Sequence, residues 1–363
     1  MSMVTETKDA TSDLIGSAAT ELLGRVWQIG ELRKGSGLDA ARTAWPAAAA
    51  AGWFSLLDTA SAEKIEFADV LPTFRAAGTA LLAGPLFSAA VAGPSLFPDA
   101  APDLRFDDGS VAFSGGGWVG GPRPRLRMPT KSTVSGQVVL PEGDPAARYL
   151  VLPVGLSYGA ALAIVATGQP GVVIRRLPTP DAVWSPCVVS LDGAEAAALI
   201  AGDNEAVGWL PTWHGCAWAL RSAGVLNALV DLAVDYAKTR EQFGGPIGRF
   251  QAVAHILADM AVQAATVDNV CSWLEQLLRT NDQRLGHTLQ TAHGHITTCL
   301  RDCAEKALQV FGGIGFTNEC DLHLYMKHAL QLSSIYGTAD QAAREVGLRS
   351  LAPKHLAHSH DAC

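Results

Sequence analysis

Apolar residues recur at helical spacing in the opening part of the chain. From about residue 13 the sequence is rich in Ala and Leu, and residues 45–57 and 67–82 repeat apolar positions every three to four residues. The pattern is interrupted by the Gly-Ser-Gly of residues 35–37 and by Pro72, where helices are expected to end. This part is predicted to be helical.

The pattern changes between about residues 98 and 197, where glycine, proline and β-branched residues dominate. Short apolar runs separated by turn residues predict strands at residues 132–140, 149–154, 171–175 and 187–191. We expect a small, barrel-like β domain here.

Long helical patterns return from about residue 210. They predict four long helices and a shorter fifth, at residues 218–239, 250–279, 284–311, 321–335 and 338–351. Four long helices joined by short connections are typical of a bundle.

The order of these parts predicts a mainly α protein with a central β domain, divided at residues 1–97, 98–205 and 206–363. A Rossmann dehydrogenase is excluded, because its strands and helices alternate along the chain.

Composition narrows the function classes. The 363 residues are 48% apolar and 17% charged, which is typical of a globular protein, and the net charge of −8 disfavours a nucleic-acid partner. The N-terminal residues resemble no signal peptide, and no run reaches the ~18 apolar residues of a membrane span. We therefore expect a soluble, cytoplasmic protein without a membrane partner.

The seven cysteines form no disulfide framework and are expected to be reduced thiols. His295, Cys299 and Cys303 share one helical face, but a straight helix spreads them over ~12 Å. Because zinc ligands must converge at ~2 Å, no metal site is predicted.

Two segments carry candidate chemistry. The first, Arg240-Glu-Gln-Phe-Gly-Gly-Pro-Ile-Gly-Arg-Phe-Gln251, places Arg240 and Gln242 beside a tight turn, where a guanidinium can grip a phosphate at two points. The second, Gln309-Val-Phe-Gly-Gly-Ile-Gly-Phe-Thr317, lets a ligand approach the backbone at Gly312 and Gly313. Each segment alone is also a common helix end.

Together and in this order, the two segments closely resemble the C-terminal domain of acyl-CoA dehydrogenases, whose patterns R-x-x-F-G-x-P-I-x-x-F-Q and Q-x-x-G-G-x-G-F/Y-T stand here almost intact. The close resemblance covers about residues 218–337, and the helix–β–helix order extends it weakly to the whole chain.

The resemblance implies FAD-dependent α,β-dehydrogenation of an acyl-CoA thioester, with electrons passing to an electron-transfer flavoprotein. In the family a glutamate takes the α-proton, and each FAD is shared between two subunits. The residues implied to bind the neighbouring subunit's FAD are Arg240, Gln242, Phe243, Gln309, Gly312 and Gly313, with Thr338 as a further candidate.

The chain departs from the family at the catalytic base. The usual glutamate precedes a Gly-Thr after the fourth bundle helix, and here Tyr336 stands at that place. Other members carry the base on the first bundle helix, where counting back from Arg240 leads to His214. Neither is a carboxylate; a tyrosine with pKa ~10 is a poor base, whereas a neutral histidine could accept a proton.

The β domain departs as well. The family's flavin loop, Thr-Glu-Pro-x-x-Gly-Ser-Asp, has no counterpart between residues 96 and 115. Trp118 either stands where the family packs an aromatic residue against the flavin or belongs to an exposed glycine-rich turn.

The family's catalytic glutamate and flavin loop, which act within one subunit, are thus missing. The two segments that the resemblance assigns to the neighbour's cofactor are kept. The chain resembles the smaller, companion subunit of actinobacterial α2β2 steroid side-chain acyl-CoA dehydrogenases, which completes the FAD site of a catalytic partner. Two alternatives stay open: a self-sufficient homotetramer using His214 or another base, and a non-enzymatic scaffold or acyl-CoA binder.

Overall fold

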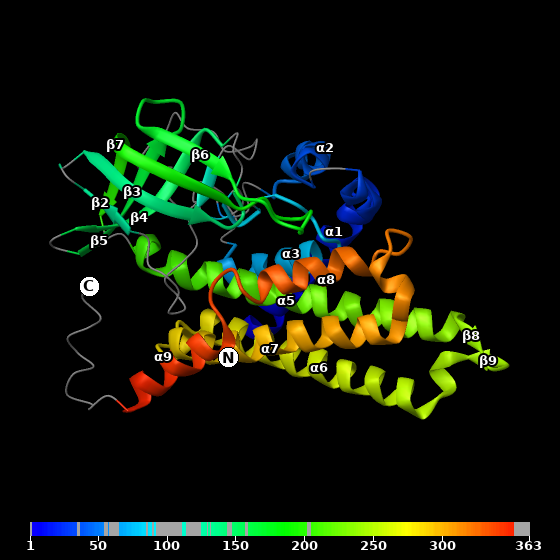
Figure 1. The fold of residues 1–363 in the computed structure, drawn as a ribbon. Helices are drawn as coiled ribbons and strands as arrows, with labels where there is room; N and C mark the ends of the chain where they lie inside the picture. Colours follow the sequence, from blue (N-terminus) through cyan, green and yellow to red (C-terminus); the bar gives the residue numbers. More distant parts are fainter. Residues whose placement is uncertain are drawn as a thin grey trace.

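The computed structural model describes residues 2–34, 37–53, 57, 65–84, 86–88, 91, 111–113, 125–128, 130, 132–143, 147–156, 159–201 and 205–351. Its amino-terminal part contains the helices α1 (Ser2–Val26), η1 (Ile29–Arg33), α2 (Gly37–Ala50) and α3 (Phe67–Thr79). Helix α3 lies between α1 and the long helix α5, so the amino-terminal part is packed directly on the C-terminal bundle (Figure 1).

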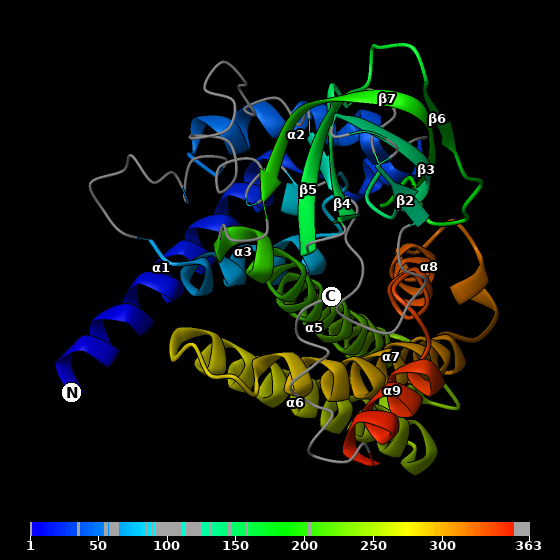
Figure 2. The ribbon, with the colours of Figure 1, turned by 90° about the vertical axis from the view of Figure 1, so that its left-hand side faces the viewer.

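Seven strands form one curled sheet above the helices (Figure 2). They are β1 (Val111–Phe113), β2 (Arg125–Arg127), β3 (Thr133–Leu140), β4 (Tyr149–Leu156), β5 (Gly159–Ala166), β6 (Val172–Arg176) and β7 (Cys187–Ala201). The strand order is β1-β4-β5-β7-β3-β2, and β6 also pairs with β7. The first half of β7 pairs with β3 and β6 and its second half with β5, so this one long strand bends the sheet into a half barrel.

Both faces of the central strands are buried. Leu150 and Leu152 point into the core of the half barrel, whereas Val151, Leu162 and Ile164 belong to the larger core shared with the helices. Because alternate side chains of a strand face opposite sides, this double burial explains why β4 is apolar throughout rather than alternating.

The C-terminal part is a bundle of α5 (Glu205–Thr239), α6 (Gln251–Arg279), α7 (Leu285–Phe311) and α8 (Leu322–Leu332), followed by α9 (Ala339–Leu351). A hairpin of β8 (Glu241–Gln242) and β9 (Gly245–Pro246), with the short helix η3 (Ile247–Arg249), joins α5 to α6, and η4 (Gly312–Phe316) follows α7. Within α5, residues Gly208–Thr239 are long and apolar enough by composition to cross a membrane, but 72% of an apolar 18-residue stretch within them is buried in this protein.

The predicted fold class is confirmed, and the residue limits of several elements are corrected. Helix α5 begins at Glu205 rather than at residue 218, and the helix predicted after residue 45 ends at Ala50. Pro72 does not end a helix but lies inside α3, where a Cβ added at Gly16 of α1 would come within 2.7 Å of its ring. The domain limits after residues 97 and 205 remain predictions.

The sheet differs more from its prediction. Strand β5 was not predicted, because its sequence is mostly Ala and Gly, which have low strand propensity. Strand β7 was expected to end at residue 191 before Asp192-Gly193, which is a typical turn pair. Gly193 instead takes a positive φ of 63° inside the strand, and pairing with β5 continues to Ala201.

Helices α3 and α5 approach each other closely through two glycines. A Cβ added at Gly224 of α5 would lie 2.2 Å from Arg75 O, and one added at Gly78 of α3 would lie 2.1 Å from Arg221 O. Both distances are far below van der Waals contact with backbone atoms, so any side chain at either position forces the helices apart.

Gly224→Ala is therefore expected to lower the free energy of unfolding by roughly 1–3 kcal/mol, the usual cost of overpacking. Gly208→Ala, on the same helix with nothing within 4 Å of the added Cβ, is the matched control and should change stability by less than ~1 kcal/mol. Thermal and urea unfolding measure both. Equal effects of the two substitutions would contradict the close-contact explanation.

Candidate functional site

The turn between α5 and α6 holds an exposed aromatic ring in a strained backbone conformation. Phe243 and Gly244, between β8 and β9, have φ values of 51° and 85°. A two-residue hairpin turn with both central residues left-handed favours Asn-Gly or Gly-Gly, and a left-handed Phe costs roughly 1–2 kcal/mol. The Phe243 side chain is nevertheless 87% exposed, so no burial of its ring within the chain offsets that strain. Strain of this kind is typical of a contact site.

The second segment leaves its backbone open. Helix α7 ends at Phe311, and Gly312 follows with a φ of 65°, which a side chain rarely adopts. A Cβ added at Gly312 or Gly313 would meet nothing within 4 Å. Packing within the described residues therefore does not require glycine at residue 313, and its backbone is open to close approach by another molecule.

The two segments lie at the same end of the bundle. The rings of Tyr236, near the end of α5, and Phe311, at the end of α7, stack with centroids 4.2 Å apart and planes 11° from parallel. Arg240 follows Tyr236 by one helical turn, and Gly312 directly follows Phe311. The stacked pair therefore fixes the corner hairpin (residues 240–249) beside the α7 terminus (residues 309–313), as Figure 1 shows.

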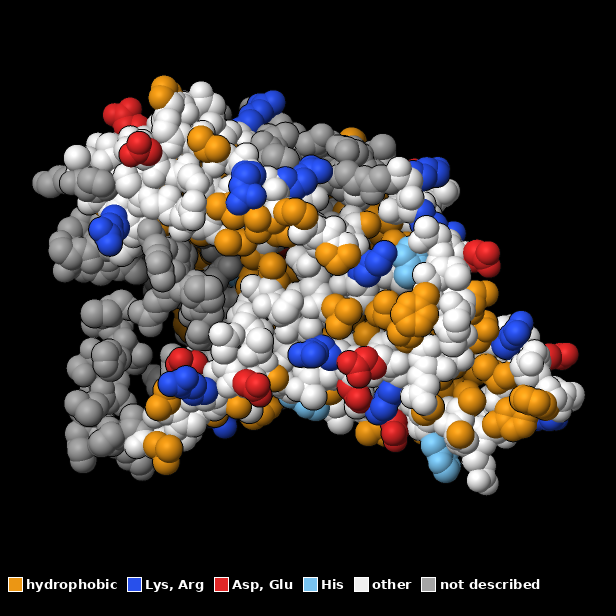
Figure 3. All heavy atoms as spheres, in the orientation of Figure 1, with side chains coloured by type: hydrophobic (Ala, Val, Ile, Leu, Met, Phe, Trp, Pro, Cys, Tyr) orange, Lys and Arg blue, Asp and Glu red, His pale blue; other side chains and the backbone are white. Residues whose placement is uncertain are grey.

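The side chains at this end face outward. Those of Arg240, Gln242 and Gln309 are exposed and form no hydrogen bond or ion pair with another residue in the described part of the chain. Figure 3 shows hydrophobic, basic and acidic side chains together where the hairpin projects from the bundle. Outward N–H donors of Arg240 and Gln242 beside an open glycine backbone fit an anionic group such as a pyrophosphate, held by a second molecule or subunit.

Thr338 is not brought together with the other six candidates. It directly precedes α9, which lies at the opposite end of the bundle from the hairpin (Figure 1). The start of α9 packs near Gly294, since a Cβ added there would be 3.7 Å from Ala339 O. Gln309 is fifteen residues further along α7, or ~22 Å at the rise of a straight helix.

The two residues at the positions where the resemblance expects a catalytic base, by contrast, contact each other. The Tyr336 hydroxyl hydrogen-bonds His214 Nε2 at 3.1 Å, with the two residues only 6% and 3% exposed. Burial lowers the pKa of His214 to about 3 and raises the pKa of Tyr336 well above its ordinary value. Both side chains are therefore neutral at pH 7, and neither is an effective proton acceptor.

Aromatic side chains pack against this pair. Phe87 lies edge-on to the His214 ring at 4.8 Å, and Phe113 lies 5.7 Å from it. Trp184, which is fully buried, lies edge-on to the Tyr336 ring at 6.3 Å. These rings therefore surround part of the Tyr336–His214 pair, at the positions where the resemblance puts the catalytic base.

A buried charge network borders the pair. Arg221 of α5 donates to Leu82 O and to His328 Nε2, the latter at 3.2 Å. Because a guanidinium can only donate, His328 Nε2 accepts, and His328 Nδ1 donates to Asp181 Oδ2 at 2.9 Å. Burial lowers the pKa of His328, and the Asp181 carboxylate opposes this effect.

Glu142, in the turn after β3, is a group that the sequence did not reveal. Its Oε1 lies 4.0 Å from His214 Nε2, and 11% of its side chain is exposed. Its buried Oε2 has no hydrogen-bond partner among the described residues. Burial raises the pKa of Glu142 from 4.5 to about 7, against the opposing effects of Arg221 and the Phe87 N–H. No motif marks this glutamate, whereas Arg221 could have been noticed as a lone charge in an apolar helix.

Other predicted features can be placed or set aside. Trp118 and most of the interval searched for the flavin loop lie outside the described residues. Cys303 Sγ donates to Gln263 Oε1 at 2.9 Å, and His295 Nε2 hydrogen-bonds Thr266 Oγ1 at 3.0 Å. Within the described part of the chain no group of three or more His, Cys, Asp or Glu residues could hold a metal ion.

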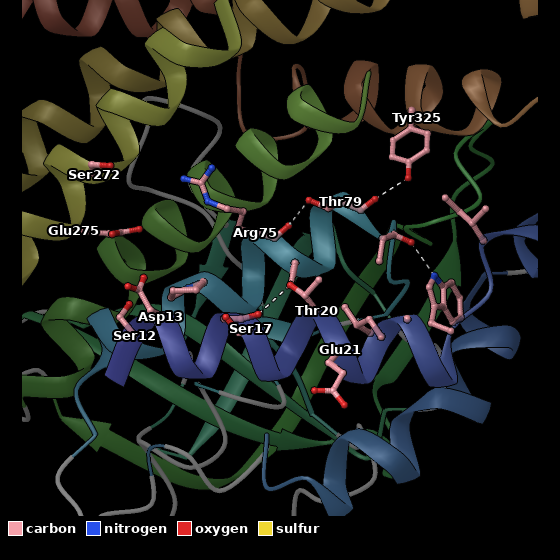
Figure 4. Close-up of a pocket in the computed structure, with 18 residues that line it drawn as sticks. Ser12, Asp13, Ser17, Thr20, Glu21, Arg75, Thr79, Ser272, Glu275 and Tyr325 are labelled. Carbon is pink, nitrogen blue, oxygen red and sulfur yellow. Dashed lines mark hydrogen bonds between the residues drawn. The ribbon is translucent and has the colours of Figure 1, made fainter. Parts of the chain in front are cut away.

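A cavity of about 990 Å³ lies elsewhere, between α1 on one side and α3, α6 and α8 on the other (Figure 4). Its lining contains the carboxylates Asp13, Glu21 and Glu275, and its Arg75 is paired with Asp268. Neither the corner hairpin nor the Tyr336–His214 pair contributes to it.

Known proteins resemble this chain in both sequence and fold. Residues 215–351 match the family described as Acyl-CoA dehydrogenase, C-terminal domain. The Mycobacterium tuberculosis proteins FadE34 and FadE27 are 30% identical over 277 residues and 31% identical over 212 residues. These alignments cover 74% and 56% of this chain but 36% and 56% of the relatives, so the chain spans between about a third and somewhat over half of their length.

Two solved structures share the fold over 94% of this chain, each with a TM-score of 0.81. One is the ChsE4–ChsE5 complex from M. tuberculosis, 24% identical with 98% of that chain covered. The other is a single-residue variant of the Tcur3481–Tcur3483 steroid ACAD, 21% identical with 97% of that chain covered. The fold is therefore that of an acyl-CoA dehydrogenase. Together with the match of residues 215–351, this shows that the chain carries the C-terminal domain of the acyl-CoA dehydrogenases within the fold of that family.

The Glu142 carboxyl gives a pH-dependent prediction. Because its pKa is higher in the folded than in the unfolded chain, its contribution to stability is complete below pH ~4.5 and is lost as the pH rises to about 7. Glu142→Gln should remove this loss and raise the free energy of unfolding at pH 8 by roughly 1–3 kcal/mol, with little change at pH 5.

Urea unfolding at the two pH values measures this effect, with the exposed Glu305→Gln as control. A Glu142→Gln effect of equal size at pH 5 and pH 8 would show that the carboxyl is not the titrating group.

Proposed function

We propose that this chain is the companion subunit of a heteromeric, FAD-dependent acyl-CoA dehydrogenase, completing the FAD site of a catalytic partner in an α2β2 assembly. The observation that carries the proposal is a contrast within one chain. The corner hairpin and the α7 terminus present unpaired donors to the outside, while the base positions Tyr336 and His214 are neutral, hydrogen-bonded to each other and packed against aromatic rings.

Each set of residues has a defined role in this proposal. Arg240 and Gln242 bind the pyrophosphate of the partner's FAD, Phe243 contacts the same nucleotide, and Gln309 with the Gly312 and Gly313 backbone completes the adenosine side. The bound FAD supplies the hydride acceptor for α,β-dehydrogenation of the acyl-CoA thioester. The partner subunit supplies the catalytic glutamate and holds the substrate.

The substrate class and further partners follow from relatives. A structure described as a steroid ACAD shares this fold, which supports a steroid side-chain CoA thioester as the substrate of the assembly. The proposal includes an electron-transfer flavoprotein as electron acceptor and a cytoplasmic location.

A self-sufficient homotetramer is the second candidate, and Glu142 is the observation in its favour. A carboxyl group with a pKa near 7 beside both base positions has the acid strength expected of a general base. His214 is a weaker candidate for that role, because its pKa of about 3 makes it a poor proton acceptor.

A non-enzymatic acyl-CoA binder is less well supported. Coenzyme A carries phosphate groups, and the cavity between α1 and α6 is lined by three carboxylates and an arginine that is already paired. Such a lining repels a phosphate-bearing ligand.

Flavin content separates these candidates. The chain purified alone should be colourless, and co-expression with its catalytic partner should give a yellow complex with about one FAD per pair of subunits, because FAD stabilises only the assembled site. Absorbance of the released flavin and the subunit ratio measure this.

A lone chain that retains FAD and oxidises acyl-CoA would establish the self-sufficient candidate instead, and Glu142→Gln should then abolish its activity. A complex without flavin would leave only the non-enzymatic candidate.

Arg240→Ala should weaken FAD binding by the complex about 10- to 100-fold, the loss expected for one charged hydrogen-bonding group. The chain should still fold, because the Arg240 side chain is exposed and has no hydrogen-bonding partner in the described part of its own chain. Arg344→Ala, an exposed substitution on α9 at the other end of the bundle, is the control. Unchanged FAD affinity in the Arg240 variant would remove Arg240 from the proposed site.

A further inference from the structure

We propose that Arg249 is a positioning residue that locks the corner hairpin in the conformation in which Arg240 and Phe243 meet the partner's cofactor. This inference rests on the proposed function for its consequence, but its structural part concerns this chain alone. The motif segment does not single out Arg249, and its side chain points back across the turn.

The guanidinium of Arg249 bridges the two residues of the turn. Arg249 Nη2 donates to Phe243 O, and Arg249 Nη1 donates to Gly244 O at 3.2 Å. Phe243 and Gly244 are the two consecutive left-handed residues. One planar side chain therefore holds both carbonyls of the turn whose backbone conformation is unfavourable for Phe.

The surroundings fit the guanidinium closely. A Cβ added at Gly245 would lie 2.8 Å from Arg249 Nη1 and 3.2 Å from its Cζ, so glycine at residue 245 leaves room for this side chain. On its other side the guanidinium carbon lies 5.0 Å from the Phe250 ring centroid, within cation–π distance. The Phe250 ring in turn lies edge-on to Phe243 with centroids 6.1 Å apart.

The hairpin connects the Arg249 clamp, which is the Arg249 side chain bonded to the carbonyls of Phe243 and Gly244, to Arg240. Ile247 N donates to Arg240 O at 2.8 Å across the base of the hairpin, and Glu241 pairs with Pro246. A turn that relaxes changes the direction of Arg240 and moves the exposed Phe243 ring. Only two residues of each strand are paired in this hairpin, so it has little support apart from the contacts of Arg249.

The chemistry of the clamp separates positioning from direct charge contact. An ammonium group keeps the charge of Arg249 but cannot hold two carbonyls with the fixed fork of a guanidinium. If Arg249 acts by positioning, Arg249→Lys therefore behaves like Arg249→Gln; if it acts as a charge on a phosphate, Arg249→Lys retains function.

The first measurement is amide hydrogen exchange on the full-length chain without partner or cofactor. Arg249→Gln and Arg249→Lys should each accelerate exchange at the hairpin amides, including Ile247, about 10-fold, while exchange in α6 and α7 stays unchanged. Arg344→Gln is the matched control. Unaltered exchange at the hairpin in both Arg249 variants overturns the inference.

The second measurement is FAD affinity of the complex with its partner. Both Arg249 variants should weaken FAD binding about 10-fold without changing subunit assembly. Adding Arg249→Gln to Arg240→Ala should cost less than Arg249→Gln alone, since residues that act through one another are not additive. The positioning role is overturned if Arg249→Lys binds FAD with wild-type affinity. It is also overturned if the effects of Arg240→Ala and Arg249→Gln on FAD binding are fully additive.

The two measurements also separate this inference from the proposed function. A wild-type complex that holds no FAD contradicts the proposed function. The structural role of Arg249 is then tested by the hydrogen-exchange measurement alone. A yellow wild-type complex whose Arg249 variants bind FAD normally contradicts the positioning role alone.

Discussion

The buried guanidinium of Arg221 joins the three parts of this molecule. From the bundle helix α5 it donates to Leu82 O in the amino-terminal part and to His328 on α8, and it lies 5.2 Å above the ring of Trp184, which precedes β7. Burial lowers the pKa of Arg221, and the Glu142 and Asp181 carboxylates oppose that effect. A buried cation is tolerated only when it is surrounded by such partners, so the three parts must be assembled together for Arg221 to be satisfied.

This joint lies beside Tyr336 and His214, which hydrogen-bond each other. Phe87 and Trp184 pack against that pair. At the far end of the bundle the Tyr236–Phe311 stack holds two loops that face outward. The contrast between the buried Tyr336–His214 pair and these exposed loops is the basis of the proposed function.

The sequence indicated one half of the candidate site. Arg240, Gln242 and Gln309 were identified from local motifs, because the glycines and proline around them specify tight turns that any fold must accommodate. The sequence did not predict the contact of Arg249 with the turn carbonyls, nor the position of Glu142 beside His214, because a side chain's partners across a turn or between two domains depend on distances that no linear pattern encodes.

The sequence by itself determined the helical and β parts, their order, and the two glycine-rich segments at residues 240–251 and 309–317, since helical periodicity, strand composition and turn residues act over a few neighbouring positions. The tertiary structure decided what depends on long-range pairing: strand β5, which is mostly Ala and Gly, the continuation of β7 past Gly193, and the separation of Thr338 from Gln309. It also decided the chemistry of Tyr336 and His214. Burial at a junction of segments far apart in sequence sets their pKa values, and local sequence carries no measure of burial.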